Sequence, residues 1–235
     1  MALETGWTDS ELRYHKPLFD RIQQKKKDRI LRAATTEFAS YGFERANINH
    51  IAEKANVSVG SLYKYFGTKK NLFQYIVRVG LSKLQEVLEA VSGSSDIPLM
   101  SRIETVLRAI LATSRSFKDM IRLYLEISAT GKRSQATALA FDIESPSARV
   151  YSRLLSEARD RGEIRSDIDP GTTAFLIDNL FMSLQFSCVS DYYKERCRIF
   201  TGNDIYENQE KIISQTLSFV RNALAPTSKG GKRRG

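Results

Sequence analysis

The residues best suited to bind another molecule lie in segment 47–66, NINHIAEKANVSVGSLYKYF. Residues 59–66 of this segment carry three hydroxyl groups and one cation, on Ser61, Tyr63, Tyr65 and Lys64. Hydroxyl groups can bond phosphate oxygens or the edges of nucleic-acid bases, and an ammonium group attracts phosphates. This combination indicates a surface for a polyanion.

Two short helices, near 48–54 and 58–65, are expected to position these groups. Asn47 is a good N-cap for the first and Ser58 for the second, because both side chains can accept a backbone N–H. The connection contains Asn56, the best non-glycine residue for the left-handed backbone that such a turn requires. The spacing predicts a helix-turn-helix, and it leaves a generic helical hairpin open as the alternative.

The flanks of the second helix carry further signals. Gly60 removes bulk near its start, so that the backbone can approach a groove closely. Thr68 is placed to cap the next helix, which puts Lys69 and Lys70 in a first turn, where cations oppose the helix dipole at a cost of ~0.3–1 kcal/mol. Two lysines are explained there if the helix N-terminus and the ammonium groups together hold a phosphate.

The positive charge of the chain is concentrated at its ends. Residues 1–75 carry 13 Lys/Arg and 8 Asp/Glu, residues 76–225 carry 19 of each, and the last ten residues carry four basic groups and no acid, for a net charge of +9. An excess confined to one end predicts a polyanion-binding module on a neutral body. Ordinary solvated basic helices are the alternative that charge alone leaves open.

Apolar residues recur at every third and fourth position along most of the chain, and Gly and Pro separate the periodic segments. We expect an all-α fold of about nine or ten helices, near 10–40, 48–54, 58–65, 69–91, 99–113, 117–129, 134–160, 171–192 and 205–223, with a break or kink at Pro146. The expected organisation is an N-terminal extension (1–24), a helix-turn-helix domain (25–75), a larger helical body (76–225) and a basic disordered tail (226–235).

Signatures of catalysis, metal binding and membrane insertion are missing from the sequence. Cys188 and Cys197 make no disulfide framework, and His15 and His50 make no histidine-rich metal site. Residues 76–225 contain no nucleophile elbow and no dinucleotide-binding loop. No apolar run approaches the ~18 residues of a membrane span, and the acidic start is unlike a signal peptide. We therefore expect a soluble cytoplasmic protein that is not an enzyme and has no cofactor.

Residues 28–73 resemble the DNA-binding domain of the tetracycline-repressor (TetR) family of bacterial transcriptional regulators. The matching residues are Ile30, Leu31, Ala33, Ala34, Phe38, Gly42, Phe43, Ile51, Ala52, Val57, Ser58, Gly60, Leu62, Tyr63, Tyr65, Phe66, Lys69 and Leu72. The resemblance implies a three-helix DNA-binding head and a larger helical body that binds a small molecule and dimerises. Asn47 stands where the family usually has Thr or Ser, and Asn56 where it has Gly; both keep the capping and turn roles.

The resemblance also assigns site residues. The phosphate-contacting hydroxyl, tyrosine and lysine of the family fall on Ser61, Tyr63 and Lys69. The complete set expected to contact double-stranded DNA is Asn47, Ser58, Val59, Gly60, Ser61, Tyr63, Lys64, Tyr65, Lys69 and Lys70. The N-terminal extension, with Arg13, Lys16, Arg21 and the run 25–27, is either a further arm on the DNA or a solvated lead-in turn.

Aromatic and methionine side chains on apolar faces are the candidates for a small-molecule site in the body. Each one alone is better explained as core, but the resemblance implies a ligand cavity in the body, and as a group some of these side chains are expected to line it. The expected lining residues are Phe117, Met120, Tyr124, Phe141, Phe181 and Phe186. The last two helices have broad apolar faces, and the resemblance implies that they pack against a second copy, with Phe181 and Leu217 in the contact.

These expectations combine into one function and one alternative. The expected function is a homodimeric repressor that leaves a palindromic operator when a small, apolar effector binds its body. The alternative is a helix-turn-helix protein without a small-molecule sensor, acting as a constitutive or architectural DNA binder. An effector that raises the melting temperature would argue against the alternative.

Overall fold

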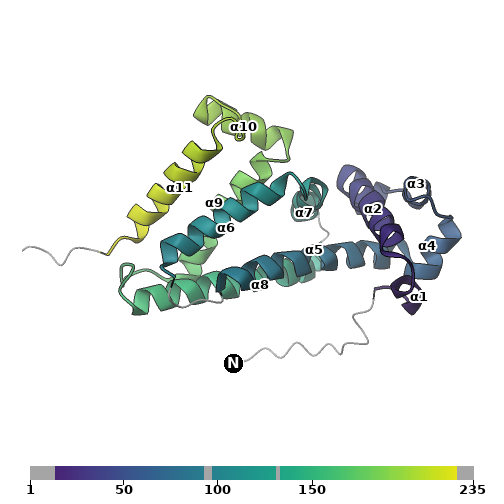
Figure 1. Ribbon diagram of the computed structural model, residues 1–235, viewed down its shortest axis with the longest axis horizontal. Helices are drawn as coiled ribbons and strands as arrows, with labels where there is room; N and C mark the ends of the chain where they lie inside the picture. The colour runs from purple at the N-terminus through teal and green to yellow at the C-terminus, as the bar shows by residue number, and fades with distance from the viewer. Residues whose placement is uncertain (1–13, 93–96, 131–132, 227–235) are drawn as a thin grey trace, which may run out of the picture. The chain divides into compact units, whose positions relative to one another are not determined.

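The structure, a computed structural model, describes residues 14–92, 97–130 and 133–226 (Figure 1). All regular elements in these ranges are helices, which confirms the all-α prediction. They are α1 (Pro17–Asp20), α2 (Gln24–Arg45), α3 (Ile48–Lys54), α4 (Val59–Phe66), α5 (Lys69–Ser92), α6 (Leu99–Ser114), α7 (Lys118–Thr130), α8 (Arg133–Asp160), α9 (Pro170–Ser187), α10 (Asp191–Thr201) and α11 (Gln209–Leu224). Much of the predicted extension and nearly all of the predicted tail lie outside the described residues. None of the described helices is both long and apolar enough to span a membrane.

The helix count exceeds the prediction because one predicted helix is divided and one helix, α10, lies mostly where no helix was predicted. The helix expected near 10–40 is α1 and α2 within the described residues, and the one expected near 171–192 ends at Ser187. Cys188 and Val189 turn into the core at that point, with side chains 3% and 0% exposed, and α10 begins afterwards. The break expected at Pro146 is absent, because α8 is one helix of 28 residues that contains this proline. The proline removes one backbone hydrogen bond, and this loss does not end a helix that also packs along α9.

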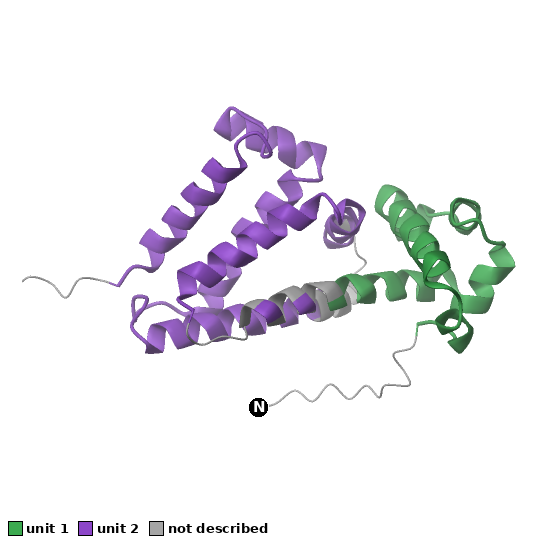
Figure 2. Cartoon of the chain, viewed as in Figure 1, with its two compact units in different colours: residues 1–82 green, residues 83–235 purple. Residues whose placement is uncertain are grey.

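The chain forms two compact units, residues 1–82 and 83–235, and α5 contributes to both (Figure 2). In the first unit α2 packs against α3, α3 against α4, and α1 against α4. Aromatic rings from α5 complete its core: Phe73 lies 5.2 Å from Phe38, and Tyr75 lies 5.6 Å from Phe66 (centroid distances). This packing fixes the helix-turn-helix on a rigid base.

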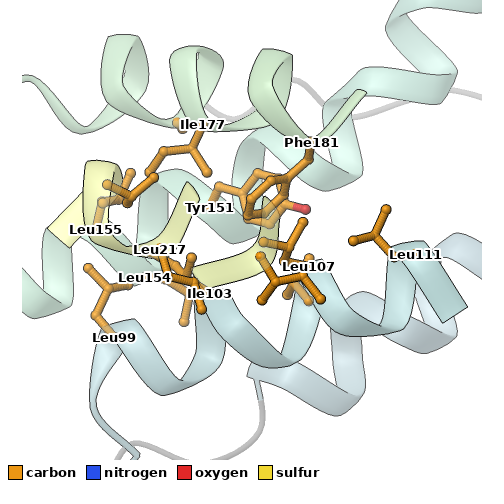
Figure 3. Packing of buried hydrophobic residues seen from close by; sticks show 14 of the residues in the cluster. Leu99, Ile103, Leu107, Leu111, Tyr151, Leu154, Leu155, Ile177, Phe181 and Leu217 are labelled. Carbon is orange, nitrogen blue, oxygen red and sulfur yellow. The ribbon is translucent and has the colours of Figure 1, made fainter. Parts of the chain in front are cut away.

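The core of the second unit is built around α9, which packs against α6, α7, α8 and α10, while α11 packs against α6. Figure 3 shows Phe181 and Leu217 among the buried side chains of this cluster, and they are only 2% and 7% exposed. The prediction that these two residues contact a second copy is therefore wrong, because both already pack inside their own chain. The large apolar side chains that α9 and α11 leave exposed are instead Phe175, Leu176 and Phe219.

Candidate functional site

The predicted helix-turn-helix consists of α3 and α4, and its capping and turn residues behave as predicted. The Asn47 side chain accepts a hydrogen bond from the Asn49 N–H at 2.9 Å, and Ser58 Oγ accepts one from the Ser61 N–H at 3.1 Å. Asn56 has a φ of 52°, within the left-handed region. These local contacts fix where each helix begins and how the chain turns between them.

A buried carboxylate that the sequence analysis missed anchors α3 to α2. Glu37 is 1% exposed, and its Oε1 accepts a hydrogen bond from the Asn47 N–H at 3.1 Å. The other carboxylate oxygen lies 3.3 Å from Lys54 Nζ, and His50 Nδ1 lies 3.5 Å from Oε1. One side chain thus binds both ends of α3. The feature of the sequence that could have indicated a buried Glu37 is its position directly before Phe38, on the inward side of α2.

The outward side of α4 presents the polar groups that could contact a nucleic acid. Tyr63 is 43% exposed, Gly60 and Lys64 are exposed as well, and Val59 and Ser61 are half-buried. A Cβ added at Gly60 would meet only Ser58 Oγ, at an ordinary contact distance of 3.9 Å. No neighbour within the chain therefore requires a glycine at this position. Its small size leaves the start of α4 open to an external partner.

Tyr65 does not lie on the outward side of α4, contrary to the prediction. It is 6% exposed, and its ring lies 5.8 Å from the Phe19 ring of α1 and 5.5 Å from Lys26 Nζ. Lys16, just before α1, donates its backbone N–H to the Tyr65 carbonyl at 2.7 Å. The described part of the N-terminal extension therefore packs on α4 and covers this tyrosine, a contact that the local pattern of the helix does not reveal.

Lys69 makes contacts within the chain that explain its unfavourable position at a helix start. Its Nζ donates to the carbonyls of Glu44 and Ala46, at 3.1 and 2.9 Å, and lies 5.0 Å above the Phe43 ring. Because carbonyl oxygens concentrate at the end of α2, this end attracts a cation. No phosphate is needed to account for Lys69. The neighbouring Lys70 is exposed, and Thr68 caps α5 as predicted, accepting from the Asn71 N–H at 3.0 Å.

The predicted effector-binding residues do not gather at one place. Phe117 and Phe141 are 44% and 50% exposed, whereas Phe186 is buried with its ring 5.7 Å from that of Tyr124. Met120 is half-buried. Phe181 borders a small cavity of about 20 Å³ lined by residues of α6, α8 and α9.

An acidic pair lies beside Tyr124 in the second unit. The Tyr124 hydroxyl donates to Glu144 Oε1 at 2.7 Å and contacts Met182 Sδ at 2.9 Å. Burial, and secondarily the charge of Glu144, raises the pKa of Asp178 to about 6. This pair could not be inferred from the sequence, because Glu144 and Asp178 lie on different helices and far apart in the chain. Within the described ranges no three His, Cys, Asp or Glu side chains are grouped so that they could hold a metal ion.

Comparison with known proteins shows which family this chain resembles. Residues 30–76 match the family model described as bacterial regulatory proteins, tetR family. The chain is 27% identical over 164 residues to the uncharacterized HTH-type transcriptional regulator YhgD of Bacillus subtilis (strain 168), covering 68% of this chain and 83% of the relative.

Solved structures share the fold. A TetR family transcriptional regulator from Chloroflexus aurantiacus J-10-FL has a TM-score of 0.67 and 18% identity, covering 89% of this chain and 98% of the other. AibR, solved in complex with isovaleryl coenzyme A and operator DNA, has a TM-score of 0.62 and 18% identity, covering 83% and 97%. The matched family and relatives are regulators of transcription and not enzymes. The family model spans α3 and α4 together with the helices that hold them, and this match, with a relative named as an HTH-type transcriptional regulator, identifies the chain as a DNA-binding transcriptional regulator of the tetR type.

Proposed function

We propose that this regulator is a homodimeric repressor that binds a palindromic operator through α4 and is released by a small molecule. The observation that carries the proposal is the outward side of α4, where hydroxyl and ammonium groups surround an open glycine at the start of a capped helix. Such a helix start allows close approach to a groove of DNA. The protein would act in the cytoplasm, with the DNA.

The proposed contacts divide by role. Tyr63 and Lys64 face outward from α4, and Ser61 is half-buried near its start, so these side chains are assigned to phosphates and base edges. Lys70 is assigned to a phosphate near the start of α5. The earlier candidates Asn47, Ser58, Val59 and Lys69 hold or border the motif, and the first two use their side chains as caps. Tyr65 is not proposed as a contact.

Dimerisation is assigned to the exposed apolar side chains of α9 and α11. Phe175, Leu176 and Phe219 are 66%, 58% and 64% exposed. Apolar side chains of this size on the surface favour a partner that removes them from water. A two-fold arrangement would present two copies of α4 to two half-sites, which is why a palindrome is the expected operator.

The release step is assigned to the second unit. AibR, which shares the fold, was solved with isovaleryl coenzyme A and operator DNA, so this architecture accommodates an effector with an apolar acyl group. An effector that binds one conformation of the body better than another shifts the DNA-binding equilibrium by its differential affinity. The proposed effector is a small molecule with an apolar part.

The test compares two adjacent lysines on an operator isolated from random DNA by repeated selection. Lys70→Ala is expected to lower the slope of log affinity against log salt by about one phosphate contact without changing the preferred sequence. Lys69→Ala is expected to lower the melting temperature of the protein instead, because it removes two hydrogen bonds to carbonyls at the end of α2. Lys211→Ala, on α11, is the control.

The outcomes are distinct. Failure of the selection to enrich any sequence would contradict the proposal as a whole. An unchanged salt slope in Lys70→Ala, equal to that of Lys211→Ala, would remove Lys70 from the interface. A selected operator that lacks two-fold symmetry would contradict the dimeric arrangement.

A further inference from the structure

Two of the last carbonyls of α4 are bound by groups that lie outside this helix. The final C=O groups of a helix have no partner within the helix, so other donors must satisfy them. The Phe66 carbonyl accepts from the side-chain amide of Asn71, on α5, at 2.9 Å. The Tyr65 carbonyl accepts from the Lys16 N–H at 2.7 Å. The end of α4 is therefore completed in part by a residue that precedes α1.

Phe19 joins α1 to the inward side of α4, against which α1 packs (Figure 1). The side chain of Phe19 is 0% exposed. Its ring lies 4.7 Å from the Phe66 ring and 5.8 Å from the Tyr65 ring (centroid distances). It also lies 5.4 Å from the Tyr75 ring of α5. Ring pairs at such distances attract each other beyond the apolar area that they bury, so one residue of α1 completes the aromatic cluster that holds the end of α4.

The segment around α1 is also fastened to α2 and α5. Lys27 Nζ, on α2, donates to the Asp20 carbonyl at 2.8 Å and lies 5.8 Å from the centroid of the Phe19 ring. His15 Nε2 lies 2.7 Å from Asp20 Oδ1, and the His15 ring lies 4.8 Å from that of Tyr75. Although α1 is only four residues long, this segment therefore contacts three other helices of the first unit.

We propose that residues 15–20 are a positioning element for operator binding, with Phe19 at its centre. They lie outside the segment matched by the family model, which begins at residue 30. By packing on the inward side of α4 and binding one of its last carbonyls, they fix the directions in which Tyr63 and Lys64 leave its outward side. Hydrogen bonds to base edges depend strongly on direction, whereas the attraction to phosphates depends on it much less. The proposal rests on the proposed function in that α4 is the helix that contacts the operator.

The experiment measures two affinities of each full-length variant by fluorescence anisotropy, one for the selected operator and one for a duplex of shuffled sequence. Phe19→Ala is expected to weaken operator binding by about tenfold to a hundredfold, comparable to the loss of one good base contact, and to change the affinity for the shuffled duplex by less than about twofold. Leu18→Ala, also on α1 but at a side chain that is 46% exposed, is the matched control and should change neither affinity. Phe19→Leu keeps most of the apolar volume and should restore most of the operator affinity.

A purely structural role of Phe19 gives a different result. If this residue only stabilises the fold, Phe19→Ala lowers the folded fraction and reduces both affinities by the same factor. Equal losses on the two duplexes, or no loss on the operator, overturn the proposal. A Phe19→Leu variant that binds the operator no better than Phe19→Ala overturns it as well.

A second pair of variants decides the question if Phe19→Ala does not fold. Lys16→Ala removes the ammonium group but keeps the N–H that binds the Tyr65 carbonyl, whereas Lys16→Pro removes both. The φ of Lys16 is −89°, near the angle that proline imposes. Lys16→Pro is expected to bind the operator about threefold to tenfold more weakly than Lys16→Ala, the effect of one hydrogen bond, and to bind the shuffled duplex equally well. Equal operator affinities in this pair overturn the proposal.

The failure of this proposal is distinguishable from that of the proposed function. If the parent chain selects no operator, the proposed function fails and this proposal fails with it. If the parent chain binds its selected operator and Phe19→Ala binds it as tightly, this proposal alone fails and α4 keeps its assigned role.

Discussion

The contacts inside the first unit of this regulator differ in kind from the contacts inside the second unit. In residues 1–82 individual polar side chains position α3, α4 and α5. Glu37 binds both ends of α3, Ser58 caps the start of α4, and Lys69 joins the end of α2 to the start of α5. In residues 83–235 the helices are positioned by a broad apolar cluster around α9. The first arrangement specifies one geometry for a rigid partner, whereas the second can repack around a ligand.

The largest effect is expected where the apolar cluster is interrupted. Phe181→Ala removes a ring that is 2% exposed and packs against Tyr151, so it should lower the free energy of unfolding by ~3–5 kcal/mol. Phe175→Ala, on the same helix but 66% exposed, is the control and should cost far less. The measurement is urea unfolding followed by circular dichroism.

The same pair of variants tests assembly. Phe175→Ala is expected to raise the dissociation constant of the dimer in sedimentation equilibrium, because this ring is assigned to the interface between copies. Equal stability losses in the two variants would show that α9 is buried alike on both sides, and would contradict the distinction drawn between core and interface.

The difference between the units also explains what the sequence revealed. The caps, the turn at Asn56 and the bounds of α3 and α4 were predictable, because each depends on residues a few positions apart. The burial of Tyr65 was not, because it depends on α1, which ends 45 residues earlier in the chain. Glu37 was missed for the same reason: its partners belong to the next helix.

The body was predictable in composition but not in arrangement. Periodicity identified apolar faces, but it did not separate side chains that face the core, such as Phe181, from exposed ones such as Phe117. Arg102 illustrates the converse. It falls on an apolar stripe, which is a signal of burial for a charged residue, but only the packing of α8 and α9 shows that one of its donors is unpaired.

A smaller effect is expected from the acidic pair of the body, through pH. Burial and the neighbouring Glu144 raise the pKa of Asp178 to about 6, against 3.8 for an ordinary aspartate. Between these values the folded chain holds a proton that the unfolded chain has lost, so the free energy of unfolding should fall as pH rises from about 4 to 6. Asp178→Asn should remove this decline and raise stability at neutral pH by ~1–2 kcal/mol.

Asp191→Asn is the control for that measurement, because the Asp191 side chain is 92% exposed and lies on the adjacent helix α10. Urea unfolding of both variants and the parent chain across this pH range gives the comparison. A decline of equal steepness in Asp178→Asn and in the parent chain would assign the pH dependence to other groups.

The smallest effect on stability is expected in the head, at Gly60, and there the sign carries the argument. Glycine within a helix costs ~0.5–1 kcal/mol relative to alanine, and an added Cβ would meet only Ser58 Oγ at 3.9 Å. Gly60→Ala should therefore raise the free energy of unfolding by about that amount. If the start of α4 lies against DNA, the same methyl group should weaken operator binding. Thermal melting and fluorescence anisotropy of one preparation measure the two changes together. A variant that is more stable and binds DNA as tightly as the parent would show that the glycine faces open solvent in the complex, and would move the close approach to another part of α4.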